Sequence, residues 1–233
     1  MTVIEWTPAY RLIPSRFPAV GIFDHVADPA DLEVVFAVEA LTNDRLRNEL
    51  GALQLVPPED RIAGPGSTPI MAAFTHLNPD GSRFSDGSYG VFYAAESADT
   101  ALSEVGYHRA RFLRHTGEGP IELDHRLYKV DVRDDLHELR GLRKKRPELY
   151  DPEHYAAAQA FARPLRANGS WGIVYESVRR AAGECVAVFK PRALTSCRQA
   201  RHITLVWDGQ RITHWYAKSM PHAMADSRDN GSD

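Results

Sequence analysis

The amino-acid sequence predicts a single α+β domain. Segments with the apolar pattern of β-strands outnumber helical segments, and the two kinds are mixed without a regular strand–helix–strand alternation. The chain has 233 residues, of which 43% are hydrophobic and 25% charged, and this composition is ordinary for one globular core. No repeat with a period of roughly 20–50 residues is visible, which argues against a solenoid or a propeller.

Charge and segment composition exclude several classes of protein. The net charge of −3 gives no basic field for nucleic acid, and no apolar run is long enough to span a membrane. Glu5 and Pro8 interrupt the stretch where a signal peptide would be apolar, so we expect a cytoplasmic protein. Cys185 and Cys197 are too few for a disulfide framework, and we expect both to be reduced. The histidines lack the spacing of metal ligands, so no metal is expected.

The first half of the chain carries two helical patterns between short strands. Asp28 is a candidate N-cap with Pro29 at the first helical position. The expected elements are a strand at Tyr10–Ile13, helices at 29–41 and 44–50, a loop over Leu53–Pro69, a strand at Ile70–Phe74 and a turn-rich loop over Asn78–Gly90.

The second half of the chain carries the sequence signals of two helices and several strands. Ser97 caps a helix to about His115 that carries Ala98, Ala101, Leu102, Val105, Phe112 and Leu113 on one face. A further helix opens at Asp151 and Pro152 and is kinked or ended by Pro164. Strands are expected at Val91–Ala95, Ile121–Val132, Gly172–Tyr175 and Cys185–Phe189, followed by a hairpin of HITLVW and RITHWY around Asp208-Gly209. The domain is expected to span 1–222, with a disordered tail at 223–233.

The stretch GSRFSDGSYGVFYAAESADTALSEVGYH, from Gly81 to His108, places three kinds of functional side chain close together. Arg83 lies in a glycine-rich loop, Tyr93 in the next strand and Glu104 in the helix that follows. With Leu102 and Val105 facing the core, Glu104 reaches the edge of the apolar face, beside Ala101 and His108, where a cleft would begin. Taken singly, each of these residues is more simply a surface or core side chain.

These segments, with the opening Tyr-Arg-Leu and Ser177 after a short strand in WGIVYESVRR, resemble the RES-domain family. The matching positions are Arg11, Arg83, Tyr93, Glu104 and Ser177, and the resemblance extends from Tyr10 to about Trp215. Two features depart from the family pattern. The loop reads Arg-Phe-Ser where Arg-Trp-Asn is common, and a helical segment separates Arg11 from Arg83, which also brings in His76 as a lesser candidate.

The resemblance implies an ADP-ribosyltransferase-like mixed β core with flanking helices and an enzyme that cleaves the nicotinamide–ribose bond of NAD+. Such cleavage creates an oxocarbenium-like sugar cation, so a carboxylate must lie near the ribose. The expected catalytic residues are Glu104, Arg83 and Ser177. NAD+ is expected to bind to Arg11, Arg83, Tyr93 and Ser177, with the pyrophosphate also near the backbone amides of 86–90.

The acceptor of the ADP-ribosyl group stays open at the level of sequence. Transfer to a protein side chain is the first expectation, because the long opening segment could shape an acceptor surface. Attack by water or phosphate, as in an NAD+ glycohydrolase or phosphorylase, is the alternative, and a non-enzymatic nucleotide-binding module is a further one. The resemblance also implies a growth-arresting toxin with a cognate Xre-type antitoxin that blocks the cleft.

Overall fold

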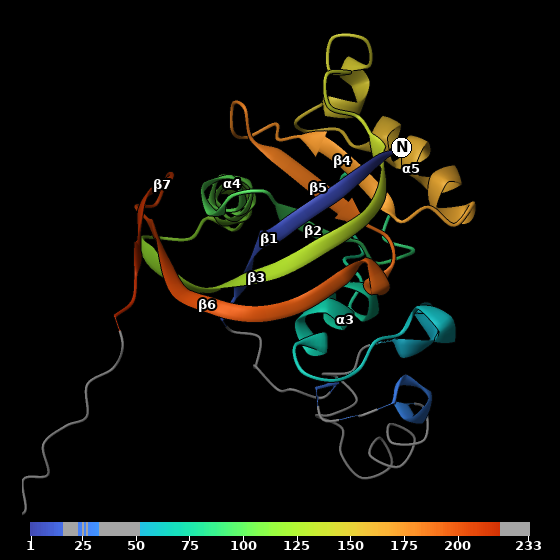
Figure 1. Ribbon diagram of the computed structural model, residues 1–233. Coiled ribbons are helices and arrows are strands. Elements are labelled where there is room, and N and C mark those ends of the chain that lie inside the picture. Colours follow the sequence, from blue (N-terminus) through green and yellow to red (C-terminus); the bar gives the residue numbers. More distant parts are fainter. Residues whose placement is uncertain (16–22, 25, 27, 33–51, 220–233) are drawn as a thin grey trace, which may run out of the picture.

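The computed structural model describes residues 1–15, 23–24, 26, 28–32 and 52–219, which form one mixed sheet with helices packed against it (Figure 1). The strand order is β1-β2-β5-β4-β3-β6-β7. The strands are β1 Thr2–Pro14, β2 Phe92–Ala95, β3 Ile121–Glu138, β4 Gly172–Glu176, β5 Glu184–Val188, β6 Leu194–Trp207 and β7 Ile212–Ala217. The α-helices among these residues are α3 Ser67–Thr75, α4 Ala98–Thr116 and α5 Ala156–Ala167. The predicted α+β class is confirmed.

Strand β1 closes part of the sheet on itself. It pairs antiparallel with β3 along most of its length and also meets β2, where Tyr10 lies opposite Ala95. The far end of β3 pairs in parallel with β4, and β5 lies between β4 and β2. The pairings β1-β2-β5-β4-β3 therefore form a closed ring, with β6 and β7 extending from β3. This closure brings Arg11, next to Tyr10, beside the strand that carries Tyr93.

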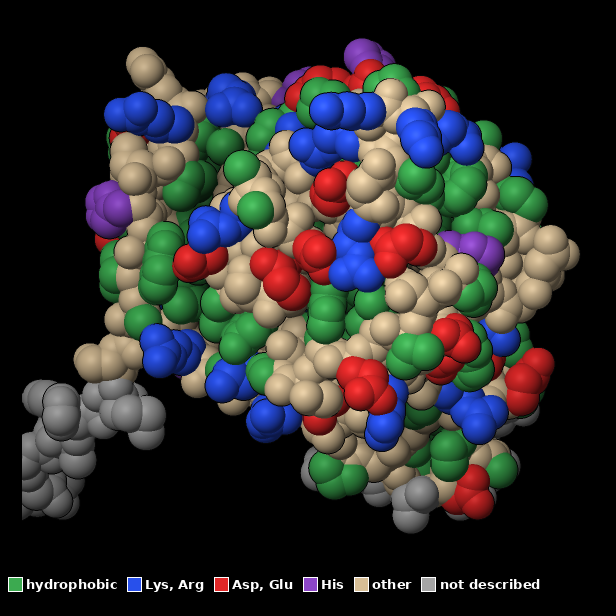
Figure 2. All heavy atoms as spheres, turned by 45° about the horizontal axis from the view of Figure 1, so that its top comes forward, with side chains coloured by type: hydrophobic (Ala, Val, Ile, Leu, Met, Phe, Trp, Pro, Cys, Tyr) green, Lys and Arg blue, Asp and Glu red, His purple; other side chains and the backbone are tan. Residues whose placement is uncertain are grey.

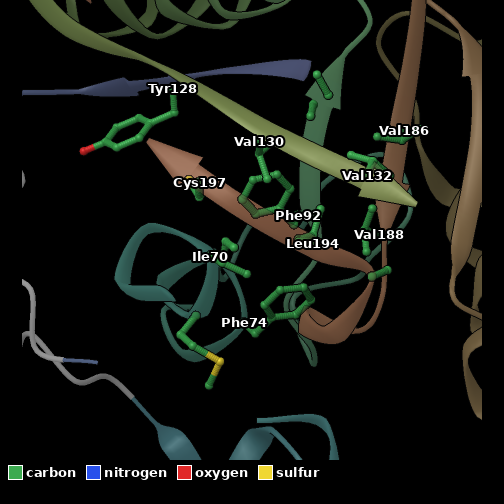
Figure 3. Packing of buried hydrophobic residues seen from close by; sticks show 14 of the residues in the cluster. Ile70, Phe74, Phe92, Tyr128, Val130, Val132, Val186, Val188, Leu194 and Cys197 are labelled. Carbon is green, nitrogen blue, oxygen red and sulfur yellow. The ribbon is translucent and has the colours of Figure 1, made fainter. Parts of the chain in front are cut away.

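Helix α3 covers one face of this sheet. Figure 3 shows Ile70 and Phe74 of α3 lying against side chains from β2, β5 and β6, including Phe92, Val188 and Leu194. All five side chains are buried. Burial of each contributes about 1.5–3 kcal/mol relative to an exposed position, so this cluster anchors the strand that leads into the site.

Helices α4 and α5 pack at other parts of the sheet. Leu102 of α4 lies in a cluster with Leu12 of β1 and Leu127 of β3. Ala158 and Ala162, one turn apart on α5, are fully buried in a cluster with residues of β4 and β5. These contacts leave α4 and the N-terminal end of α5 facing the same region, beside β1 and β2.

The prediction of a strand at Ile70–Phe74 is wrong, because these residues form the second half of α3. Ile70, Met71 and Phe74 are buried on one helical face. The start of the helix depends on a distant residue: Asp24 Oδ1 accepts hydrogen bonds from the backbone N–H of Thr68 at 2.8 Å and from its hydroxyl at 2.7 Å. A cap supplied from 44 residues away cannot be recognised in the local sequence.

The helix expected after Ser97 is confirmed as α4. The Ser97 hydroxyl accepts from the N–H of Thr100, and Gly117 ends the helix in the left-handed conformation at φ 68°. Of the predicted apolar face, Phe112 differs: its side chain is 50% exposed, whereas the adjacent Leu113 is buried.

Other boundaries shift by up to eight residues. β1 begins at Thr2 and accommodates Pro8 at a register shift between Trp6 and Ala9. β3 continues to Glu138. α5 contains Pro164 and begins only at Ala156. The helix starts later than predicted because Asp151 Oδ1 accepts from the backbone N–H groups of residues 153 and 154 and forms a separate turn.

The strands Val91–Ala95, Gly172–Tyr175 and Cys185–Phe189 are confirmed to within one residue at each end. The final hairpin is also confirmed, but its first strand, β6, begins at Leu194, eight residues before the predicted start. Asp28 caps a 3-10 turn at Pro29–Asp31. Most of the predicted helices at 29–41 and 44–50, and the predicted disordered tail at 223–233, lie outside the described residues.

The surface carries no dominant charge in the view of Figure 2, where acidic and basic side chains are interspersed over the face at the top of Figure 1. Arg140, the first residue of the basic segment RGLRKKR at 140–146, donates to both Glu138 and Glu184 at 2.6 Å. Both cysteines are free and buried. In the part of the chain that the structure describes, no helix is long and apolar enough to cross a membrane.

Candidate active site

A cavity of about 1230 Å³ lies where α4, β1, β2 and the start of α5 converge. The loop from Asn78 to Arg83 and the segment 153–156 form further walls. This volume is above the range of about 300–1,000 Å³ typical of small-molecule sites, so the cavity can hold a ligand as large as a dinucleotide.

Four of the five sequence-predicted residues line this cavity. Arg11 comes from β1, Arg83 from the glycine-rich loop, Tyr93 from β2 and Glu104 from α4. The structure thus brings together side chains that are up to 93 positions apart in the chain. Ser177 does not line the cavity but contacts Glu104 from behind.

Ser177 fixes one oxygen of the Glu104 carboxylate. The Ser177 hydroxyl donates to Glu104 Oε1 at 2.6 Å and accepts from the backbone N–H groups of Arg179 and Arg180 at 3.1 and 3.0 Å. Because two N–H donors occupy the serine oxygen, its own proton is directed to the carboxylate. Among the described residues no hydrogen-bond donor contacts Oε2, and the carboxylate therefore retains acceptor capacity for a ligand.

The turn that carries Ser177 is itself held at several points. Its backbone N–H donates to Gly183 O at 2.8 Å, and Arg143 donates to its carbonyl oxygen at 2.6 Å. A Cβ on Gly183 would lie 2.7 Å from Thr100 Oγ1, so only glycine allows this turn to pack against the start of α4. The Ser177–Glu104 contact is built on a rigid turn and a rigid helix.

Arg83 is 7% exposed and serves as a structural anchor. Its Nη1 donates to the carbonyl oxygens of Leu149 at 3.1 Å and Asp151 at 2.9 Å, and its guanidinium lies over the Tyr155 ring at 4.7 Å. The expected pyrophosphate fork is thus partly engaged by backbone carbonyls. Arg83 instead holds the segment 149–155 against the cavity.

Tyr93 holds the loop that carries Arg83. Its hydroxyl accepts from the N–H of Phe84 at 2.9 Å and lies 2.8 Å from Ser82 Oγ. Burial raises the pKa of Tyr93 to about 12, so the phenol stays protonated. Its ring lines the cavity, as a stacking surface for nicotinamide requires.

Arg11 has a buried donor without a hydrogen-bond partner in the described part of the chain. Its Nη1 donates to Tyr93 O at 2.9 Å and its guanidinium lies 4.4 Å from the centre of the Phe92 ring. Its Nε is buried and has no hydrogen-bond partner among the described residues. Burial lowers the pKa of Arg11 to about 10, which leaves the group charged near neutral pH. A buried N–H without a partner is costly unless a ligand or water accepts from it.

Two sequence candidates lie elsewhere. The stretch 86–90, whose amides are expected near the pyrophosphate, does not line the cavity, and Asp86 instead pairs with Arg163 at 2.6 Å. His76 ends α3, is exposed and also lies outside the cavity lining.

The sequence places His108 beside Glu104 but does not identify Arg111 and His115, which continue the same face of α4. His108, Arg111 and His115 line the cavity with Glu104, from which they are four, seven and eleven positions removed. The pKa of His108 is lowered to about 4 by partial burial and by the positive charges of neighbouring arginines. The helical spacing from Glu104 is the signal that could have identified these residues.

A second group, here called the clasp, joins α4 to the segment 152–153. Tyr107 donates to Glu153 Oε1, Arg111 lies 3.6 Å from Glu153 Oε2, and Arg179 donates to the carbonyl oxygen of Pro152. The Arg179 guanidinium also lies over the Tyr107 ring. The clasp fixes one side of the cavity mouth.

Comparison with models of known protein families shows to which family this chain belongs. The model of the RES domain matches residues 58–208. The chain belongs to the RES domain family. The matched region includes Arg83, Tyr93, Glu104 and Ser177, whereas Arg11 precedes it.

Two proteins resemble this RES-domain chain along most of its length. It is 33% identical over 210 residues to the uncharacterized protein y4oC of Sinorhizobium fredii (strain NBRC 101917 / NGR234), with 89% of this chain and 86% of that protein covered. A chain in the crystal structure of the M. tuberculosis MbcT-MbcA toxin-antitoxin complex is similar at a TM-score of 0.41 and 12% identity, covering 89% of this chain and 87% of that one.

Proposed function

We propose that this RES-domain protein binds NAD+ and cleaves its nicotinamide–ribose bond, and that it acts as the toxin of a toxin–antitoxin pair. The observation that carries the proposal is the Glu104 carboxylate, oriented by Ser177 at the wall of a cavity large enough for a dinucleotide. Glu104 and Ser177 are 73 residues apart in the chain, so the fold itself brings the buried serine to the carboxylate.

Glu104 has the chemistry that the bond cleavage requires. As nicotinamide departs with the bonding electron pair, positive charge develops on the ribose ring. A carboxylate fixed in advance beside the ring stabilises that charge without having to reorganise. Ser177 contributes by holding one carboxylate oxygen, and therefore acts as a positioning residue.

The remaining cavity residues suit the other parts of NAD+. The Tyr93 ring offers an aromatic face for nicotinamide. Arg11 contributes a buried positive charge, because its guanidinium lies over the Phe92 ring and donates to Tyr93 O. Arg83 shapes the wall through its bonds to Leu149 and Asp151. No step of this mechanism is routed through a metal ion.

The acceptor of the ADP-ribosyl group is proposed to be a protein side chain, with water and phosphate as the competing acceptors. All three reactions pass through the same cation at Glu104. An enzyme that consumes NAD+ would harm its own cell. We therefore also propose an antitoxin that covers the cavity and blocks NAD+ cleavage for as long as the antitoxin stays bound.

The test measures nicotinamide release from NAD+ labelled in its adenylate part, with and without cell lysate. Glu104→Gln keeps the shape of the side chain and removes its charge, and we expect release to fall about 100-fold or more. Glu118→Gln, an exposed glutamate beyond the end of α4, is the matched control and should keep full activity. Equal release by wild type and Glu104→Gln would refute the assignment.

The label distinguishes the acceptors in the same experiment. Label on a protein band only when lysate is present indicates a transferase, and label confined to small molecules indicates a hydrolase or, when release depends on phosphate, a phosphorylase. Expression without an antitoxin should arrest growth, and Glu104→Gln should relieve the arrest.

A further inference from the structure

The cavity-facing stripe of α4 continues well beyond Glu104. His108, Arg111 and His115 follow it at helical spacing, and all four side chains line the cavity. At 3.6 residues per turn they fall within an arc of about 60° around the helix. With a rise of about 1.5 Å per residue, the stripe extends roughly 16 Å from Glu104 to His115. It is therefore long enough to contact a ligand that extends away from the carboxylate.

The middle of this stripe is positively charged. Burial and, after it, the positive charges of Arg179 from the turn after β4, Arg83 from the glycine-rich loop, and Arg111 and Arg109 from α4 hold the pKa of His108 near 4. The acidic side chains that line the cavity are Asp80, Glu104 and Glu153. Among the described residues, five arginines line the cavity against these three carboxylates, and such a surplus of positive charge favours an anion.

Arg111 is better placed than Arg83 to respond to a ligand. Its side chain is 51% exposed, and its contact with Glu153 is 3.6 Å long, beyond the usual length of a charged hydrogen bond. Glu153 also accepts from the Tyr107 hydroxyl, so its charge keeps a partner when Arg111 turns toward a ligand. Arg83, in contrast, already donates to two carbonyl oxygens.

We propose that His108 and Arg111 form an anion subsite that binds the diphosphate of the substrate, one to two helical turns from Glu104. This inference rests on the proposed function, and it assigns the diphosphate to α4, beyond the predicted contacts of Arg11 and Arg83. In a dinucleotide the diphosphate is joined to the 5′ carbon of the ribose whose bond is cleaved. When the ribose lies at Glu104, the phosphates are within reach of His108 and Arg111, which line the same cavity. Neutral His108 donates one N–H, and Arg111 supplies the charge.

The test measures binding of ADP by calorimetry at constant ionic strength, so that it does not depend on turnover. Arg111→Gln should weaken ADP binding about tenfold or more, since a charge-assisted contact is lost. The matched control is Arg133→Gln, because Arg133 also forms an exposed pair with a glutamate, Glu5, but does not line the cavity. We expect this variant to bind ADP as wild type does. In the wild type, ADP should raise the pKa of His108 in nuclear magnetic resonance titrations, because the new neighbour is an anion.

Three results would overturn the inference: no ADP binding to the wild type, equal ADP binding by wild type and Arg111→Gln, or a His108 pKa that ADP leaves unchanged. Inorganic phosphate distinguishes the two sources of the anion. If phosphate binding depends on Arg111 but ADP does not compete for it, the site holds free phosphate and the assignment to the diphosphate is wrong. ADP binding that depends on Arg111, together with no nicotinamide release by the wild type, would support the subsite and refute the proposed reaction.

Discussion

Replacing Ser177 by alanine is the sharpest test of how the site is positioned. The change removes the 2.6 Å hydrogen bond to Glu104 Oε1 and leaves the N–H groups of Arg179 and Arg180 without their acceptor. A hydrogen bond to a charged group contributes about 1.5–3 kcal/mol, and each 1.4 kcal/mol corresponds to about a tenfold change. If that energy is used to hold Glu104 for the transition state, kcat for nicotinamide release should fall about 10- to 150-fold. Because Ser177 does not line the cavity, KM should change little.

The assay compares initial rates over a range of NAD+ concentrations for three variants. Ser103→Ala is the matched control, because Ser103 lies next to Glu104 on α4 and, among the described residues, its hydroxyl donates only to the carbonyl oxygen of Asp99. Ser177→Thr retains the hydroxyl and should recover part of kcat. Loss of the turn contacts in Ser177→Ala should cost about 1 kcal/mol of stability, which lowers Tm by about 2–4 °C. The protein therefore stays folded at the assay temperature.

Two outcomes would refute this reasoning. Ser177→Ala could turn over NAD+ as fast as Ser103→Ala, in which case the Glu104 carboxylate needs no support. Alternatively, KM could rise while kcat is unchanged, which would place Ser177 in substrate binding.

Two further predictions concern stability. Arg83→Lys cannot reproduce the donation to Leu149 and Asp151, so the free energy of unfolding should fall by about 2–4 kcal/mol in urea denaturation. The control, Arg163→Lys, changes an exposed ion pair and should alter this free energy by less than about 1 kcal/mol. Equal effects of the two substitutions would show that Arg83 is not an anchor. The pKa of His108 in the folded protein is about 4, below its ordinary value of 6.5, so its neutral ring favours the folded state above pH 6.5, and this contribution is lost as the pH falls toward 4. His108→Gln should therefore show a smaller fall of Tm than wild type between pH 7 and 4, and parallel Tm curves would contradict the assigned shift.

The parts of the fold that the sequence predicts well are those determined by local interactions. Helix α4 has its own cap at Ser97 and its own C-terminal glycine, Gly117, so its bounds follow from the chain itself. The hairpin after Trp207 has its turn chemistry at Asp208, which accepts from two backbone N–H groups. Helix α3 is missed because its cap comes from Asp24, and the run from Ile70 to Phe74 is equally consistent with a short strand by apolar pattern alone.

In the candidate site, too, the sequence predicts some features, whereas others depend on contacts between distant parts of the chain. The resemblance to RES domains selects Arg11, Arg83, Tyr93 and Glu104, and the structure places all of them at one cavity. What the sequence cannot show is how each side chain is engaged. The bonds of Arg83 to the carbonyl oxygens 66 and 68 positions away, and the contact of Ser177 with Glu104, depend on the tertiary fold.

The segment 149–155 is tied down twice, by Arg83 from within and by the clasp of Tyr107, Glu153 and Arg179 at the mouth. A binding wall that is already ordered in the free protein loses little conformational entropy when a ligand arrives. The cost of ordering this wall is met once, during folding, rather than at each binding event. Ligand contacts along α4 can therefore contribute to affinity nearly in full, and association should proceed without a slow ordering step.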